Sequence, residues 1–178
     1  MHPQGLLQPL PVPTGAWHDI TMDFVEGLPL SEGADVILVV VDRFTKYAHF
    51  VPFRHPFTSP QVACVFVDLV VKLHGMPHSI TSDRDRIFTS NFWKLLFQSL
   101  GTKLHFTTAY HPQTDGQSER VNQCLEMFLH CMVQDTPKQW RRWLPSAEFW
   151  YNSTYHTSLG CSPFKALYGH DPICGFTD

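Results

Sequence analysis

The sequence predicts an α/β fold in which a five-stranded mixed sheet is flanked by helices. Short apolar runs rich in β-branched residues indicate the strands, and VILVVVD over residues 36–42 is the clearest of them. Segments with apolar residues at helical spacing indicate the helices, most securely over residues 59–74. Because the two patterns interleave along the chain, we expect a sheet covered by helices in one folded domain. Its predicted bounds are residues 16–172, between an extended, proline-rich linker at 1–15 and a short tail at 173–178.

The first three predicted strands form an antiparallel meander. Residues 17–27 alternate between an apolar face and a second face that carries Asp23. A carboxylate in the middle of a strand destabilises the fold unless something pairs with it, so Asp23 is a candidate ligand. Residues 36–42 and 47–53 then follow after short connections, which favours neighbouring strands joined by turns.

The middle of the chain predicts a crossover back onto this sheet. A helix begins at the Thr58-Ser59-Pro60 sequence and stops at Gly75. The strand at 78–82 follows the helix, so we expect it to run parallel to the first strand, with Asp83 at its carboxyl end. A second helix, from the Ser90 cap to Gly101, precedes a fifth strand at 103–107.

The next helix carries one prominent carboxylate, Glu119. Thr114 and Gln117 resemble a capping box, which predicts that the helix begins near Asp115. Glu119 then lies in the second turn, on the side away from the apolar residues, and these are Val121, Leu125, Phe128, Leu129 and Met132. Beyond it we expect an amphipathic segment over 140–150 that is broken or restarted at Pro145, and a short final helix over 162–168.

Composition limits the possible functions. The five cysteines form no CxxC pair, which favours reduced thiols and argues against a zinc site. No apolar run approaches about 18 residues, so we expect no membrane association. The chain has 13 basic and 16 acidic residues, and Arg84, Arg86 and Arg120 are the basic residues near its motifs. A nucleic-acid binder with this balance needs metal ions or neighbouring domains to offset phosphate charge.

The predicted topology brings Asp23 beside Asp83, and the Glu119 helix can pack across the sheet at that point. Three carboxylates without a basic partner repel one another, and a divalent cation relieves the repulsion. Carboxylate oxygens are hard ligands that suit Mg²⁺ or Mn²⁺. The residues alone therefore predict a candidate metal site at Asp23, Asp83 and Glu119.

Five segments around these carboxylates resemble the catalytic core of retroviral-type integrases, specifically those of gypsy-type LTR retrotransposons. They are WHDITMDFVEGLP, VVVDRFTKYAHF, KLHGMPHSITSDRDRIFTSNFW, LGTKLHFTTAYHPQTDGQSERVN and AEFWYNSTYHTSLGCSPFKALYG, and they lie within residues 17–172. The resemblance implies an RNase H-like fold and an integrase catalytic core over 16–172. It also implies that Asp23 in TMDF, Asp83 in TSDRD and Glu119 in QSERVN are the catalytic residues and hold two Mg²⁺ or Mn²⁺ ions.

The resemblance further implies DNA 3′-end processing and strand transfer, with the ends of the element and target DNA as substrates. His111, Gln113, Gln117 and Arg120 are candidate DNA contacts, on or next to the polar loop before the helix. We expect a core rather than a whole enzyme, a homo-oligomer in the full enzyme, synthesis in the cytoplasm and action in the nucleus. Two alternatives stay open. One is an RNase H-type nuclease limited to the water reaction, and the other is a catalytically idle nucleic-acid-binding or interaction module derived from a retrotransposon.

Overall fold

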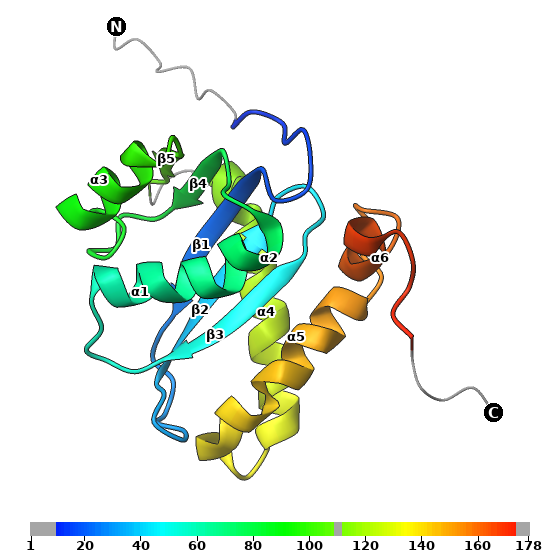
Figure 1. Cartoon of the computed structure of the whole chain (residues 1–178). Helices are drawn as coiled ribbons and strands as arrows, with labels where there is room; N and C mark the ends of the chain where they lie inside the picture. The colour runs from blue at the N-terminus through cyan, green and yellow to red at the C-terminus, as the bar shows by residue number, and fades with distance from the viewer. Residues whose placement is uncertain (1–9, 109–111, 174–178) are drawn as a thin grey trace, which may run out of the picture.

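A computed structural model describes residues 10–108 and 112–173, and for residues 112–118 it describes the backbone alone. The strands form one sheet in the order β3-β2-β1-β4-β5 (Figure 1). Their bounds are β1 Asp19–Val25, β2 Val36–Asp42, β3 Ala48–Phe53, β4 Ser79–Ser82 and β5 Lys103–Phe106. β1, β2 and β3 pair antiparallel, whereas β4 runs parallel to β1 and to β5. The predicted mixed sheet of five strands is confirmed.

Helices cover both faces of this sheet (Figure 1). Their bounds are α1 Ser59–Phe66, the π-helical turn η1 Val67–Val71, α2 Lys72–His74, α3 Asn91–Ser99, α4 Pro112–Val133, the 3-10 helix η2 Pro137–Trp143, α5 Leu144–Ser153 and α6 Pro163–Tyr168. A capping box between Thr58 and Gln61 starts α1, and the helical backbone continues through η1 and α2 to Gly75. Gly75 has a φ of +85°, which glycine adopts without strain.

The strand periodicity divides the core into two layers. On one face, Ile20 and Met22 of β1 pack with α1 and α3 through Phe66 and Trp93. On the other face, Val25 and alternate residues of β2 and β3 pack with α4 and α5. β2 is buried along its whole length because both faces of the sheet are covered. Asp23 belongs to the face covered by α4.

Two details of α4 differ from the prediction. The helix begins at Pro112, so Thr114 lies within its first turns and is not the N-cap that we expected. Proline suits the start of a helix because its fixed φ is helical and its missing N–H is not needed there. Met132, which we expected in the core, is 39% exposed. The local capping pattern therefore placed the start of this helix too late.

Side chains of α5 cap the outer edge of β3. The Asn152 amide accepts the N–H of Ala48 at 2.8 Å and donates to its carbonyl at 2.9 Å. Glu148 Oε1 accepts the N–H of Phe50 at 2.7 Å, and Pro52 has no N–H to offer. An unpaired strand edge attracts other strands, so these three residues block further pairing along β3 and attach α5 to the sheet.

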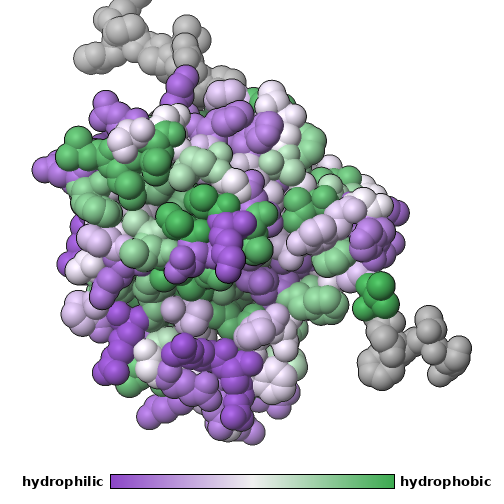
Figure 2. All heavy atoms as spheres, viewed as in Figure 1, coloured by the Kyte–Doolittle hydropathy of each residue, from purple (hydrophilic) through white to green (hydrophobic). Residues whose placement is uncertain are grey.

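Apolar side chains are exposed on the opposite layer of helices. Figure 2 shows them over α3 and along the helical run from α1 to α2, and they include Leu73, Phe92 and Leu95. Within the part of the chain that the structure describes, no helix combines the length and apolar character needed to cross a bilayer.

Candidate active site

Two of the predicted ligands lie close together on neighbouring parallel segments, Asp23 within β1 and Asp83 directly after β4. Met22 of β1 is in register with Ser82, the last residue of β4, and Asp23 and Asp83 are the residues that follow each of them. Neighbouring strands are about 4.8 Å apart, so the pairing brings the two carboxylates side by side. Asp23 is half-buried and Asp83 is exposed. The crossover predicted from the sequence therefore brings Asp23 and Asp83 to neighbouring positions, as expected.

Local hydrogen bonds orient both aspartates. Asp23 Oδ1 accepts the backbone N–H of Phe24, the next residue, at 2.9 Å. Asp83 Oδ1 accepts the N–H of Asp85 at 3.0 Å in a short turn after β4. These bonds within the local backbone orient the two carboxylate side chains.

Helix α4 is tied to this position by an asparagine. Asn122 Nδ2 donates to Asp23 Oδ2 at 2.9 Å, and no described residue donates to the buried Asn122 Oδ1. Glu119 precedes Asn122 by one helical turn and is exposed. Val121 and Leu125 bury the opposite side of the helix against the sheet. Glu119 therefore belongs to the turn of α4 next to the one that contacts Asp23, and Asn122 is a site residue that the sequence analysis missed.

The donor set fits a hard divalent cation, because all three predicted ligands are carboxylates. The described residues nevertheless contain no group of three or more His, Cys, Asp or Glu side chains gathered closely enough to hold a metal ion. The structure brings Asp23 and Asp83 to neighbouring positions and leaves Glu119 exposed on the facing helix. The shared binding of two ions by all three residues stays a prediction.

The predicted DNA contacts fall mostly outside the described part of the chain. His111 is not among the described residues, and the side chains of Gln113 and Gln117 are not described either. Arg120 is described and exposed, and it follows Glu119 on α4. Its charge acts on Tyr151 of α5 and on His156. Arg120 is thus placed beside the candidate site, whereas its contact with DNA stays a prediction.

A histidine pair forms a separate polar cluster near β3. The Nε2 atoms of His49 and His74 are 2.9 Å apart, and the Trp17 ring stacks on His74 with centroids 3.9 Å apart. His49 Nδ1 lies 3.6 Å from Glu148 Oε2. Burial, and then the charge of His49, lower the pKa of His74 to about 4. The pair links β3 to α2 and contains none of the predicted site carboxylates.

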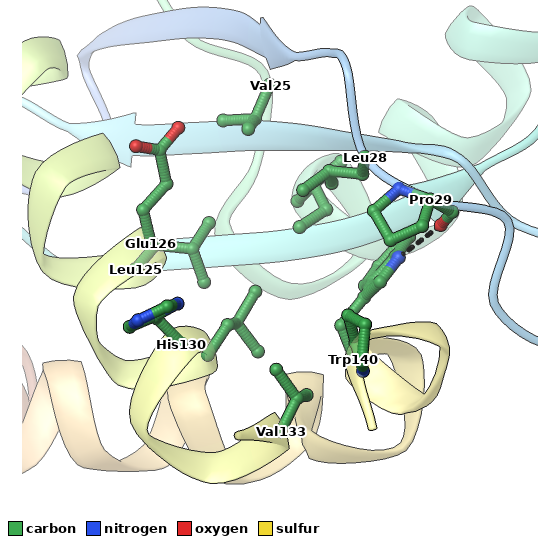
Figure 3. Close-up of a pocket in the computed structure, with 11 residues that line it drawn as sticks. Val25, Leu28, Pro29, Leu125, Glu126, His130, Val133 and Trp140 are labelled. Carbon is green, nitrogen blue, oxygen red and sulfur yellow. Dashed lines mark hydrogen bonds between the residues drawn. The ribbon is translucent and has the colours of Figure 1, made fainter. Parts of the chain in front are cut away.

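An apolar cavity of about 190 Å³ lies at the other end of α4 (Figure 3). Val25, Leu129 and Val133 contribute to its walls, and Trp140 Nε1 closes one side by donating to the Pro29 carbonyl at 2.6 Å. Glu126 and His130 lie on the side away from Pro29 and Trp140 in Figure 3. Because neither Glu119 nor the two aspartates line it, the cavity is not part of the carboxylate site.

Comparison with known proteins identifies relatives of this fold and sequence. No family model matches the chain. The transposon Tf2-3 polyprotein of Schizosaccharomyces pombe is 37% identical over 170 residues, which are 96% of this chain and 13% of the polyprotein. The Tf2-4 polyprotein of the same yeast matches to the same extent. The chain therefore spans a small part of the curated relatives that it matches.

Solved structures with the same fold include retroviral integrases. A chain of the simian T-cell lymphotropic virus intasome, in complex with the PP2A regulatory subunit B56 gamma, superposes with a TM-score of 0.72. Its identity is 19%, over 85% of this chain and 54% of that one. The HTLV-2 integrase catalytic core, in complex with magnesium in a trimeric form, gives a TM-score of 0.67 at 18% identity, over 85% of this chain and 97% of that one.

The chain is similar in sequence to part of a retrotransposon polyprotein and shares the fold of retroviral integrase catalytic cores. A third structure, the catalytic core of BIV integrase, gives a TM-score of 0.66 at 21% identity and covers 86% of this chain and 95% of that one. The resemblance to an LTR-retrotransposon integrase core, and the RNase H-like fold that it implies, are confirmed. The identities to solved structures are low, so these comparisons support the integrase fold and do not assign roles to Asp23, Asp83 or Glu119.

Proposed function

We propose that this integrase core carries out metal-dependent 3′-end processing of DNA and DNA strand transfer. One observation carries the proposal. Asp23 and Asp83 follow paired residues on adjacent parallel strands, and Asn122 holds the helix of Glu119 against Asp23 at 2.9 Å. Carboxylates placed in this way, in a fold shared with integrase cores, suit phosphoryl transfer between nucleic-acid strands.

Asp23, Asp83 and Glu119 would hold two Mg²⁺ or Mn²⁺ ions. Bound there, the ions would activate a water or a DNA 3′-OH and stabilise charge on the leaving oxygen. The chain's own groups set the positions of the ligands. The Phe24 and Asp85 N–H groups fix the two aspartates, and Asn122 keeps Asp23 facing α4. These bonds would orient the carboxylates of Asp23 and Asp83 before any ion arrives.

Two reactions follow from one arrangement. With water as nucleophile, a new P–O bond forms at a phosphodiester near the DNA end, and the bond to the 3′ oxygen breaks. With the freed 3′-OH as nucleophile, the same displacement at a target phosphodiester joins the two DNAs. Each reaction exchanges one phosphodiester P–O bond for another P–O bond, so neither needs a covalent protein intermediate or an external energy source.

The partners in this proposal are DNA and further copies of the chain. The HTLV-2 integrase core occurs in dimeric and trimeric forms, which supports a homo-oligomeric arrangement of the full enzyme here. The element's ends and the target would be the two DNA substrates. Integration into chromosomal DNA would then take place in the nucleus.

A strand-transfer assay tests the proposal. The chain is incubated with short labelled DNA ends and a plasmid, with Mg²⁺ or Mn²⁺ or with EDTA. Glu119→Gln should abolish both trimming and joining. Glu126→Gln is the matched control, because Glu126 is also exposed on α4 but lines the apolar cavity, and it should keep the wild-type rates. Trimming without joining would instead support a nuclease of the RNase H type, and metal-independent products would contradict the proposal.

A further inference from the structure

The turn between β2 and β3 is rigid and has a distinctive composition, Arg43-Phe44-Thr45-Lys46. Asp42 is fully buried beneath it. Its carboxylate accepts the N–H groups of Phe44 and Thr45 at 3.2 and 3.1 Å, and the Thr45 hydroxyl at 2.6 Å. The Lys46 N–H closes the turn on the Asp42 carbonyl at 2.9 Å. The side chains of this turn are therefore presented from a fixed backbone.

The turn combines an exposed aromatic ring with two cations. Phe44 is 46% exposed between Arg43 and Lys46. Lys46 Nζ donates to the Arg43 carbonyl at 3.0 Å, and Arg43 donates to the Pro11 carbonyl at 3.1 Å. No ion pair among the described residues includes Arg43 or Lys46. Burial and the nearby Arg43 lower the pKa of Lys46, against an opposite effect of Asp42. An anion here would therefore relieve repulsion between the two cations.

The positive charge continues from this turn toward the carboxylate site. His156 contacts the Tyr151 ring, with centroids 5.0 Å apart. Burial first, and then the charges of Arg120 and Lys46, lower the pKa of His156, while a hydrogen bond with the Tyr151 backbone raises it. The charges of Lys46 and Arg120 thus both act on His156, and Asn152, near the end of α5, accepts the N–H of Ala48, two residues after Lys46, at 2.8 Å. Because Arg120 is adjacent to Glu119 in sequence, we define Arg43, Phe44, Lys46 and Arg120 as the basic strip.

We propose that the basic strip binds the backbone of duplex DNA beside the carboxylate site. Arg43, Lys46 and Arg120 would contact phosphates, and the Phe44 ring would pack against the sugars. The inference rests on the proposed function, because it takes the strip's ligand to be the DNA that the carboxylates process. The sequence analysis named Arg84, Arg86 and Arg120 as the basic residues near the motifs, and this inference adds Arg43 and Lys46 to them. Arg43 and Lys46 belong to the turn that follows Asp42, the last residue of β2, and only the fold brings them and Arg120 near the same residue, His156.

The strip explains how a chain with net charge −3 can approach a polyanion. Overall charge opposes binding, so affinity depends on local groups that release counterions from the phosphates. Each phosphate neutralised in duplex DNA contributes about 0.9 to the slope of log affinity against log salt. Removing two of the three strip cations should therefore lower the magnitude of the slope by about 1.8.

The test is fluorescence anisotropy of a labelled duplex across a salt series with the full 178-residue chain. The variant is Arg43→Gln/Lys46→Asn, because Lys46 has a φ of +65° and asparagine tolerates that conformation. Lys138→Asn/Arg142→Gln is the matched control. These two residues belong to η2, which contacts the β1–β2 hairpin at the opposite end of β2 through Arg142 and Glu32, 3.9 Å apart.

We expect the strip variant to bind at least about tenfold more weakly at low salt, with the shallower slope, and the control to behave as wild type. Phe44→Ser should weaken binding without changing the slope, because it removes no charge. A second measurement needs no variant. Acetylation of the wild-type chain, read by mass spectrometry, should show Lys46 protected by the duplex and Lys138 unprotected. If the strip variant melts at a lower temperature than wild type, its weaker binding could reflect unfolding, and the acetylation footprint of the wild type then tests whether the strip binds DNA.

Equal slopes for the strip variant and its control, or equal acetylation of Lys46 with and without DNA, would overturn the inference. Undetectable binding of the wild type at low salt would do the same. The failure of the proposed function has a different signature. A wild type without strand transfer, but with the expected slopes and footprint, would retain the strip as a DNA-binding surface and remove the catalytic assignment.

Discussion

Asn152 provides a direct test of how α5 is attached to the sheet. Its side chain is 1% exposed and makes two hydrogen bonds with the backbone of Ala48, which is itself fully buried. Asn152→Ala removes both bonds and leaves one N–H and one carbonyl of Ala48 without partners. A buried polar group that loses its partner costs about 1–3 kcal/mol.

The two losses together predict a decrease in unfolding free energy of roughly 2–4 kcal/mol, allowing for some relaxation at the strand edge. That is a large share of the roughly 5–15 kcal/mol that stabilises a typical domain. For a chain of this size, 1 kcal/mol corresponds to about 2–4 °C in Tm, so Tm should fall by roughly 4–16 °C. Urea unfolding measured by circular dichroism gives the free energy, and thermal melts give Tm.

Asn91→Ala is the control, because Asn91 is exposed at the first position of α3 and the change should stay within about 0.5 kcal/mol. Asn152→Asp tests the direction of the two bonds. Its protonated form can still donate to the Ala48 carbonyl, so its folded pKa should be raised. Its stability relative to wild type should then be highest at low pH and should fall as pH rises. A cost below about 1 kcal/mol for Asn152→Ala would refute this account of the strand edge.

Three further predictions concern the metal site, the asparagine beside it and the histidine pair. Millimolar Mn²⁺ should raise the Tm of the wild type but not that of Asp23→Asn/Asp83→Asn, since a ligand bound only by the folded state stabilises it; equal shifts would place the ions elsewhere. Asn122→Ala should need more Mn²⁺ for the same rise in Tm, because the amide that orients Asp23 is lost, and an unchanged titration would contradict that role. His74 has a folded pKa of about 4, below its ordinary 6.5, so stability present above pH 6.5 should decline as pH falls toward 4. His74→Asn should flatten that decline in urea unfolding at a series of pH values, and a parallel decline would assign the effect to other groups.

Local sequence patterns determined most of the secondary structure. Alternation in β1 and the continuous apolar run of β2 identified the strands and the faces they bury, because side-chain direction repeats every two residues. Thr58 and Ser90 marked the starts of α1 and α3 correctly, since a capping bond spans three residues and needs no tertiary contact. The same type of signal at Thr114 was wrong, because the helical backbone begins earlier, at Pro112. A local cap can lie inside a longer helix.

The predicted strand topology was enough to place the two aspartates next to each other. A helix between two strands makes the crossover parallel, so the sequence predicted that Asp83 would lie beside Asp23, and the register of β1 with β4 agrees. The family resemblance supplied Glu119 as their partner. The sequence could not show how α4 is held, because Asn122 and Asp23 are 99 residues apart and their hydrogen bond depends on the packing of helix against sheet.

Only the tertiary structure decided which polar residues work together. Asn152 and Ala48 are 104 residues apart, and nothing in either local pattern predicts that α5 caps the edge of β3. The sequence of the turn that holds Arg43 and Lys46 did not indicate a binding site, and Arg120 comes much later in the chain. Periodicity reports which face of an element is buried, whereas the meeting of two polar groups depends on the relative position of whole elements. That position is set by the packing of the two apolar cores.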